Sequence, residues 1–274
     1  MSEQIKQNQG AAESQSMPSR DGQKWTRDET ILALGLYFQM TWGRIHSRSR
    51  EIVELAQKMG RTPSSLAMKM VNIGRCDPTL AARGVGGLAH GGKSEAMLWN
   101  EFVDHRDSLS IEFDRCLKAV GGNPVLEKDD AIIKTPPGLD GMRLSHYRIN
   151  QSFFRGAVLA AYSNTCCITG ICDKRLLIAS HIRPWAKCDS GNDRTDVRNG
   201  LCLSALYDRA FDKGLITIDQ EYRVVLSSSL KGSLTVSAYD EYFKKFDGYR
   251  INTPDRSKPL PAFLQYHNEN VFVT

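Results

Sequence analysis

A stretch near the middle of the chain, VGGNPVLEKDDAIIKTPPGLDG at residues 120–141, is rich in glycine, proline and aspartate and separates two regions of different character. It has neither helical nor strand periodicity, and proline and glycine interrupt both kinds of element. The 274 residues of the chain are enough for two small domains. We therefore predict an N-terminal domain over residues 25–119, a linker over 120–145 and a C-terminal domain over 146–274.

Residues 1–24 are rich in Gln, Ser, Glu and Gly and hold almost no bulky apolar side chain. Such a segment cannot bury enough surface to offset the entropy of ordering, so we predict a disordered tail. The same start lacks the apolar region of a signal peptide, and no stretch approaches the roughly 18–20 apolar residues that span a bilayer. We expect a cytoplasmic protein with no membrane partner.

The N-terminal region predicts a succession of helices. Thr26 followed by Glu29 is a capping-box pattern, and the apolar run after it predicts a mostly buried first helix. Apolar side chains at helical spacing predict a second helix that stops at Gly60. Thr62 and Pro63 suit the cap and first position of a third helix. Residues 94–119 are predicted as a further helix with its aromatic side chains in the core.

Positive charge is concentrated in this region. The chain carries 36 Lys and Arg against 31 Asp and Glu, a net charge of +5, and residues 41–76 alone hold seven basic residues against two Glu. The segment resembles a helix-turn-helix module of the Myb-like sort, with the third helix as the recognition helix. A helical scaffold without a DNA role stays open as the alternative. On the resemblance, the groove-facing residues are Ser64, Ser65, Ala67, Met68 and Lys69, and the nucleic-acid contacts include Arg48, Arg61 and Lys69.

The C-terminal region places polar side chains at the ends of short elements. After an amphipathic helix at about residues 150–162, the apolar stretch LLIASHI predicts a buried strand that ends at His181. A polar loop then runs to Asn199, and the short apolar stretch LCL leads to a helix between Ser204 and Gly214. The stretches GLITID and YRVVLS predict an antiparallel strand pair.

Two carboxylates lie on the helix that follows Ser204. Asp208 and Asp212 are four residues apart, about 40° around the helix axis, so both leave from one face. Like charges at this spacing repel one another unless a cation joins them. The pair is therefore a candidate cation site.

Residues 147–219 resemble an HNH endonuclease domain. The resemblance rests on CCITG, on IASHIRPW, on the pair NG at 199 and 200, and on LSALYDRAFDKGLITID. It implies an α+β chain, in which a helical, helix-turn-helix-like N-terminal domain precedes a C-terminal ββα-metal nuclease domain. It also implies the hydrolysis of phosphodiester bonds.

The resemblance assigns roles to individual residues. His181 is the general base, since imidazole titrates near neutral pH, and Asn199 braces the loop against the strand that carries His181. Asp208 stands where the family usually has a metal-binding His, and Asp212 follows where a second helix ligand can lie. Ser180 precedes His181 where family members often place His or Asp. These oxygen ligands favour Mg²⁺ or Mn²⁺, and Zn²⁺ or Ni²⁺ stay open.

Further basic and sulfur-containing side chains lie around this segment. Four arginines are candidate phosphate contacts, with solvent exposure of at least two of them as the alternative: Arg155, Arg175, Arg183 and Arg194. Five of the seven cysteines fall between Cys166 and Cys202 without a pair of C-x-x-C sequences. This spacing favours buried free thiols over a structural zinc site.

The sequence thus predicts a metal-dependent endonuclease that hydrolyses DNA, of restriction or defence type. A catalytically inactive DNA-binding or regulatory protein with an HNH-like domain is the first alternative, because the third family His is absent and Ser180 replaces another usual residue. An RNA-directed nuclease is the second. Because one HNH site cuts one strand at a time, double-strand cleavage would imply a homodimer or sequential nicking.

Overall fold

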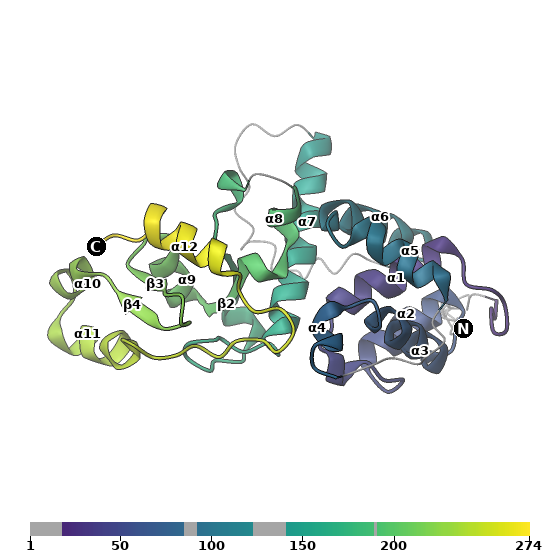
Figure 1. The fold of residues 1–274 in the computed structure, drawn as a ribbon, viewed down its shortest axis with the longest axis horizontal. Helices are drawn as coiled ribbons and strands as arrows, with labels where there is room; N and C mark the ends of the chain where they lie inside the picture. The colour runs from purple at the N-terminus through teal and green to yellow at the C-terminus, as the bar shows by residue number, and fades with distance from the viewer. Residues whose placement is uncertain (1–17, 85–91, 123–140, 189–190) are drawn as a thin grey trace, which may run out of the picture.

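The computed structural model describes residues 18–84, 92–122, 141–188 and 191–274 (Figure 1). Most of the tail predicted over residues 1–24 and most of the linker predicted over 120–145 lie outside these ranges. The described part is mostly helical in its N-terminal region and carries small β-hairpins in its C-terminal region. The predicted α+β class is confirmed. None of the described helices is long and apolar enough to cross a membrane.

The first helices begin and end where their capping residues predict. Thr26 caps α1 by accepting a hydrogen bond from the Glu29 backbone at 3.2 Å, and the Glu29 carboxylate accepts from the Thr26 N–H at 2.7 Å. Gly60 ends α2 in the left-handed conformation, with φ at 67°. The N-terminal helices are α1 (Arg27–Phe38), α2 (Arg50–Met59), α3 (Pro63–Gly74), α4 (Pro78–Ala81), α5 (Lys93–Phe102) and α6 (Arg106–Ala119), with a 3₁₀ turn, η1 (Trp42–Arg44).

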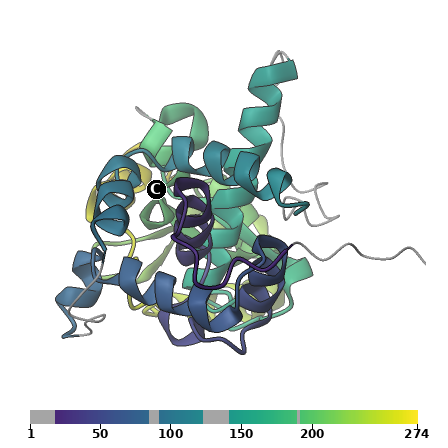
Figure 2. The ribbon, with the colours of Figure 1, turned by 90° about the vertical axis from the view of Figure 1, so that its right-hand side faces the viewer.

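Residues 94–119, predicted to be helical, form two helices, because the chain leaves the helical path between Phe102 and Arg106. His105 has φ −136° and ψ 52°, outside the helical region. Helices α5 and α6 both pack against α1 (Figure 2). Nearly all residues of α1 are buried. The break lets Phe102 and Leu109 each reach this shared core from a different direction.

Helix α7 (Gly141–Ala161) begins well before the predicted start near residue 150 and is shared by two hydrophobic clusters. Its first turns mix polar and apolar residues and project from the body of the molecule in Figure 1. Farther along, Phe153 belongs to the N-terminal cluster and its neighbour Phe154 to the C-terminal one. Helix α7 therefore forms a wall common to both regions.

The C-terminal region contains an antiparallel hairpin followed by a helix. Strands β1 (Leu177–His181) and β2 (Gly200–Ser204) pair in a register that sets His181 opposite Gly200. Helix α9 (Ala205–Asp212) follows β2 directly and packs on both strands. The predicted second strand pair is confirmed as β3 (Ile216–Ile218) and β4 (Val224–Leu226).

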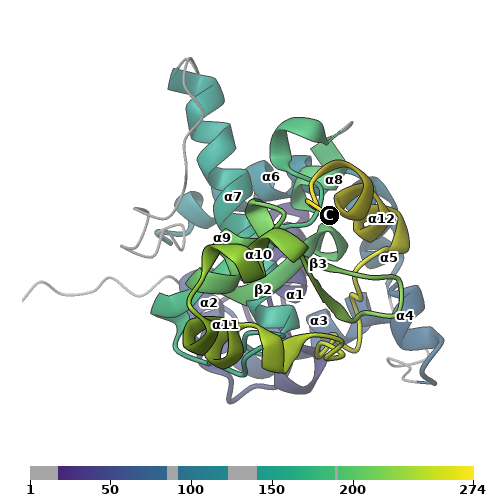
Figure 3. The ribbon, with the colours of Figure 1, turned by 90° about the vertical axis from the view of Figure 1, so that its left-hand side faces the viewer.

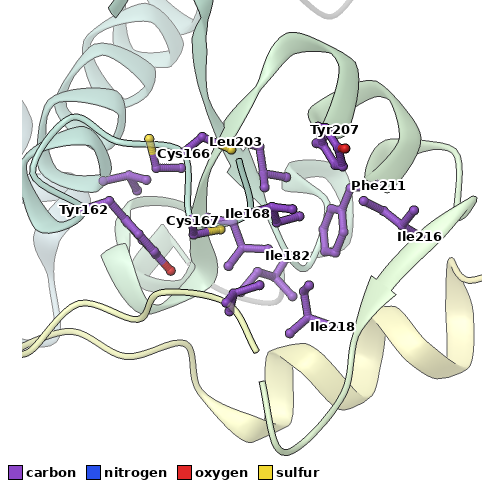
Figure 4. Packing of buried hydrophobic residues seen from close by; sticks show 14 of the residues in the cluster. Tyr162, Cys166, Cys167, Ile168, Ile182, Leu203, Tyr207, Phe211, Ile216 and Ile218 are labelled. Carbon is purple, nitrogen blue, oxygen red and sulfur yellow. The ribbon is translucent and has the colours of Figure 1, made fainter. Parts of the chain in front are cut away.

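Further short elements complete this region (Figure 3). They are η3 (Lys174–Leu176), η4 (Trp185–Lys187), α8 (Gly191–Thr195), η5 (Val197–Asn199), α10 (Ser228–Ser233), α11 (Val236–Tyr242), η6 (Lys244–Phe246) and α12 (Pro261–Asn270). Figure 4 shows the core beneath the hairpin, where Cys167, Ile182, Leu203 and Phe211 pack together. This core holds β1, β2 and α9 in fixed relative positions.

Candidate functional site

His181 is held at the end of β1 by close packing against α7. Its ring stacks on Phe154, with ring centroids 3.8 Å apart and planes 13° from parallel, and meets Trp185 edge-on at 5.6 Å. Glycine is required opposite it, because a Cβ at Gly200 would lie 2.4 Å from Val158 Cγ2 and 2.9 Å from Phe154 Cζ. The hairpin can therefore lie close enough to α7 for the imidazole to rest on the phenyl ring.

One hydrogen bond fixes the protonation pattern of the His181 ring. Its Nε2 lies 2.9 Å from the Arg194 carbonyl oxygen. A carbonyl oxygen only accepts, so Nε2 donates, and the neutral ring keeps its lone pair on Nδ1. Burial lowers the pKa of His181 to about 4, against the opposing effects of the Arg194 carbonyl and the Asp212 charge. The ring is thus neutral near pH 7 and has a nitrogen able to accept a proton.

Asn199 links the loop that carries Arg194 to the segment after β1. Its side chain is fully buried. The amide oxygen accepts from the Arg183 N–H at 2.8 Å, and the amide nitrogen donates to the Arg183 carbonyl at 3.2 Å and the Asp193 carbonyl at 2.9 Å. Since Asp193 adjoins Arg194 in α8, Asn199 ties the His181 hydrogen-bond acceptor to the strand end that carries His181.

A cavity of about 600 Å³ brings the predicted acidic residues and the histidine together. Its walls include His181 and Ser180 from β1 and Asp208 and Asp212 from α9. Residues of α1 and α2 line its other side, so both regions of the chain contribute to it. The cavity is large enough for a phosphate group with its flanking sugar.

The candidate metal ligands are oxygen atoms that differ in exposure. Asp208 is only 6% exposed, and the Asp212 charge raises the pKa of His181, so this carboxylate lies near the imidazole. The Ser180 hydroxyl is buried and has no hydrogen-bond partner among the described residues. A buried hydroxyl without a partner beside two carboxylates fits a hard divalent cation such as Mg²⁺ or Mn²⁺. In the described ranges no three or more His, Cys, Asp or Glu side chains are grouped so as to hold a metal ion.

Two of the four arginines predicted as phosphate contacts, Arg155 and Arg183, lie in different surroundings. Arg155 lines the cavity and donates to the carbonyl oxygens of Leu177 at 2.8 Å and Lys174 at 3.2 Å. Arg183 does not line it, because its guanidinium pairs with Asp193 at 3.3 Å and lies over the Tyr266 ring at 4.7 Å. Only Arg155 of this pair faces the space where His181 lies.

Two predicted nucleic-acid contacts in the N-terminal region are buried. The Arg61 side chain is 2% exposed and makes paired hydrogen bonds to Glu29, both at 2.9 Å. The Lys69 ammonium forms a 2.7 Å ion pair with Glu95 and lies over the Trp25 ring. The prediction that Lys69 faces a groove is wrong, and neither residue is available to a phosphate. Of the others, Ser64, Met68 and Arg48 are exposed, whereas Ala67 is buried.

Several functional contacts escaped sequence reasoning. The sequence predicts that Phe154 lies on an amphipathic helix, but its spacing does not indicate that it supports the imidazole of His181. The hydrogen-bond acceptor for that imidazole is a backbone carbonyl, which every residue possesses. Tyr147 packs on Trp185 at 4.9 Å between centroids, and both line the cavity. These contacts join residues far apart in sequence, so only the fold reveals them.

All seven cysteines lie in the described ranges, and none of them forms a disulfide bond. Within the 166–202 segment, Cys172 is exposed and the others are buried. Burial raises the pKa of Cys188 to about 11 and that of Cys202 to about 12. These thiols stay protonated near neutral pH and act as small core residues.

Comparison with known proteins identifies the segment that holds the site. Residues 166–219, about a fifth of the chain, match the family model described as HNH endonuclease. A solved structure, "Modification dependent TagI restriction endonuclease", is 19% identical, with a TM-score of 0.30. That match covers 43% of this chain and 37% of the other, so this chain corresponds to less than half of that protein's length. No curated protein matches this chain.

Proposed function

Because residues 166–219 form an HNH endonuclease domain, we propose that this chain is a metal-dependent endonuclease that hydrolyses DNA phosphodiester bonds. One observation carries the proposal. A neutral, oriented histidine lines the same cavity as two carboxylates. Both carboxylates lie 27 or more residues after the histidine in the sequence. Phosphodiester hydrolysis requires a base for water and a positive charge near the phosphate, and this cavity can supply the base and hold a cation.

His181 is proposed as the general base. Its Nε2–H is committed to the Arg194 carbonyl, so Nδ1 is the atom that takes a proton from the attacking water. The stacking on Phe154 holds the ring in one plane, and the Asp212 carboxylate favours the protonated ring once it forms. Asn199 is proposed to keep the Arg194 carbonyl in place while the proton moves.

Asp208, Asp212 and the Ser180 hydroxyl are proposed to hold the divalent cation, with Mg²⁺ or Mn²⁺ favoured by their oxygen atoms and Zn²⁺ or Ni²⁺ as further candidates. Such an ion stabilises negative charge on the phosphate and on the departing oxygen. Asp208 lies buried in the cavity wall, whereas Asp212 is exposed.

DNA is the proposed substrate, and restriction or defence the proposed type of activity. Arg155 faces the cavity beside His181 and suits a backbone phosphate, and Arg48 is exposed on the loop before α2. One such site cuts one strand at a time, so cleavage of both strands by a single binding event requires a homodimer.

The proposal is tested by incubating the purified protein with supercoiled plasmid in Mg²⁺, Mn²⁺, Zn²⁺, Ni²⁺ or EDTA. We expect nicking with at least one of these ions, none in EDTA, and none with Asp208→Asn. Asp247→Asn is the matched control, since Asp247 is an exposed aspartate of the same region that does not line the cavity. DNA binding without cleavage in every ion, on plasmid and on phage DNA, would replace the proposal by a DNA-binding role. Cleavage of single-stranded RNA alone would replace DNA by RNA as substrate.

A further inference from the structure

A buried ion pair joins the N-terminal helices to the loop that orients His181. Arg106, the first residue of α6, places its Nη1 3.1 Å from Asp196 Oδ1, and the two side chains are 13% and 10% exposed. The guanidinium also lies over the Phe38 ring, 4.8 Å from its centroid. Figures 1 and 3 both show α6 beside α8, the short helix that ends just before Asp196.

Asp196 occupies a central position in this loop. Its carboxylate caps the 3₁₀ turn η5 by accepting from the Arg198 N–H at 2.9 Å, and its carbonyl accepts from the Asn199 N–H at 2.9 Å. It follows Arg194, whose carbonyl holds His181, by two residues. A shift of Asp196 would therefore move both the acceptor of the His181 hydrogen bond and the backbone of Asn199.

The loop is thus held from two sides. Asn199 ties it to the strand end on the inner side, through the carbonyls of Arg183 and Asp193. Arg106 holds it on the outer side, from a helix that belongs to the other region of the chain. We propose that Arg106 is a positioning residue: by holding Asp196 it fixes the Arg194 carbonyl, and through that carbonyl the orientation and tautomer of His181. The proposal rests on the base role assigned to His181 above.

General stability is a poor explanation for this arginine. Burying a guanidinium costs free energy, and apolar residues of similar size often replace buried ion pairs without loss of stability. The Nε of Arg106 is buried without a hydrogen-bond partner among the described residues, so part of its desolvation is uncompensated. Asp196 also has a second partner, Arg198, at 2.6 Å, and does not depend on Arg106 for neutralisation. What Arg106 adds is a directional bond that anchors the loop to α6.

It follows that the helical region completes the nuclease site. Displacing a catalytic group by about 1 Å can cost about 100-fold in rate. We therefore expect Arg106→Met to lower kcat by about 10- to 100-fold with KM changed less than about twofold, since Arg106 does not line the cavity that receives substrate. Arg106→Lys restores most of kcat, because an ammonium can still donate to Asp196.

The matched control is Arg256→Met. Arg256 is also a largely buried arginine between the two regions, since its Nη2 donates to the Tyr37 and Met40 carbonyls at 3.2 Å and its guanidinium lies 4.4 Å from the Tyr37 ring centroid. It is carried by the segment before α12 and not by the His181 loop. Replacing Arg256 weakens the contact between the N-terminal and C-terminal regions but leaves the bonds of Asp196 in place. We therefore expect kcat to stay within about twofold of wild type.

A second readout is independent of activity. Selective ¹⁵N labelling of the six histidines gives one signal pattern per ring, and His181→Ala identifies that of His181. In the full-length protein at pH 7.5 we expect His181 to be a single Nε2–H tautomer in wild type and Arg256→Met. In Arg106→Met we expect a mixture of tautomers, and Arg106→Lys should return the single form.

The outcomes separate the two proposals. If wild type cleaves no substrate, the proposed function fails while the tautomer measurement still decides the role of Arg106. A wild-type tautomer and kcat in folded Arg106→Met overturn the positioning role, and so does an equal effect of Arg256→Met. If Arg106→Met does not fold, Arg106→Gln takes its place, and failure of every Arg106 variant to fold also overturns the role, because the residue would then serve the fold as a whole.

Discussion

Asn199→Ala removes the side chain that ties the His181 loop to β1. The amide of Asn199 satisfies the Arg183 N–H, the Arg183 carbonyl and the Asp193 carbonyl, and the residue has no exposed surface. Alanine leaves these backbone groups without their partner, and the space is buried. The perturbation therefore acts on hydrogen bonds and leaves the surrounding apolar packing in place.

The expected cost follows from the number of bonds. Each intramolecular hydrogen bond contributes about 1 kcal/mol net, and a buried group left unsatisfied costs about 1–3 kcal/mol. Losing three bonds in a buried site gives a decrease in the free energy of unfolding of about 3–5 kcal/mol. Part of this decrease appears as local opening of the loop around α8, because Asn199 is one of several anchors of that loop, among them the Arg183–Asp193 and Arg106–Asp196 ion pairs and the His181 hydrogen bond.

Urea unfolding followed by circular dichroism measures the total, and hydrogen exchange of peptides covering residues 191–199 measures the local part. Asn72→Ala is the matched control, because the Asn72 side-chain oxygen has no hydrogen-bond partner among the described residues, and alanine suits the α3 helix. We expect that control to change the free energy of unfolding by less than about 1 kcal/mol. An Asn199→Ala cost below about 1 kcal/mol, with unchanged exchange in the loop, would refute the brace assigned to Asn199.

Three further predictions concern a glycine beside His181, a buried ion pair of the N-terminal helices and a buried histidine of α12. Gly200→Ala should lower the free energy of unfolding by about 1–3 kcal/mol in urea titrations, since its Cβ would overlap Val158 and Phe154, whereas Gly232→Ala, with open space, should not. Arg61→Met should cost about 1–3 kcal/mol in the same assay, because it removes two hydrogen bonds to the buried Glu29 carboxylate, which keeps Arg20 as a partner, whereas Arg50→Met at an exposed pair should change little. Burial lowers the pKa of His267 to about 4, so below pH 6.5 the unfolded chain takes up its proton first, and the stability that His267 contributes above pH 6.5 is lost progressively down to pH 4. His267→Gln should make the pH dependence of unfolding in that window shallower, and an unchanged slope would contradict the buried neutral ring.

The features that the sequence predicted correctly are those encoded by neighbouring residues. Thr26 and Glu29 cap α1 within three positions of each other, and Gly60 ends α2 by its own conformational freedom. The strand that ends at His181 follows from a short apolar run before a polar loop. Each of these signals depends on local backbone chemistry, which can be predicted from neighbouring residues alone.

The features that it could not predict depend on partners far along the chain. The positive charge of Lys69 is typical of a residue that contacts a DNA groove. In the structure, Lys69 is buried in an ion pair with Glu95, which lies 26 residues away in the sequence. Phe154 supports the imidazole of His181, and the Arg194 carbonyl orients it, yet neither contact has a sequence pattern. Helix α7 begins earlier than the sequence predicts, and its first turns project from the body of the molecule. These contacts depend on tertiary packing, which the periodicity of apolar residues in the sequence does not indicate.

The central claim is that His181 is the base of a nuclease, and comparing cleavage with binding in one variant tests it most directly. Single-turnover cleavage of a DNA duplex and equilibrium binding to the same duplex are measured for wild type, His181→Ala and the exposed control His146→Ala. The account predicts that His181→Ala loses about 100-fold or more in cleavage rate while its Kd changes less than about threefold, and that the control matches wild type. Cleavage by folded His181→Ala at the wild-type rate would contradict the account.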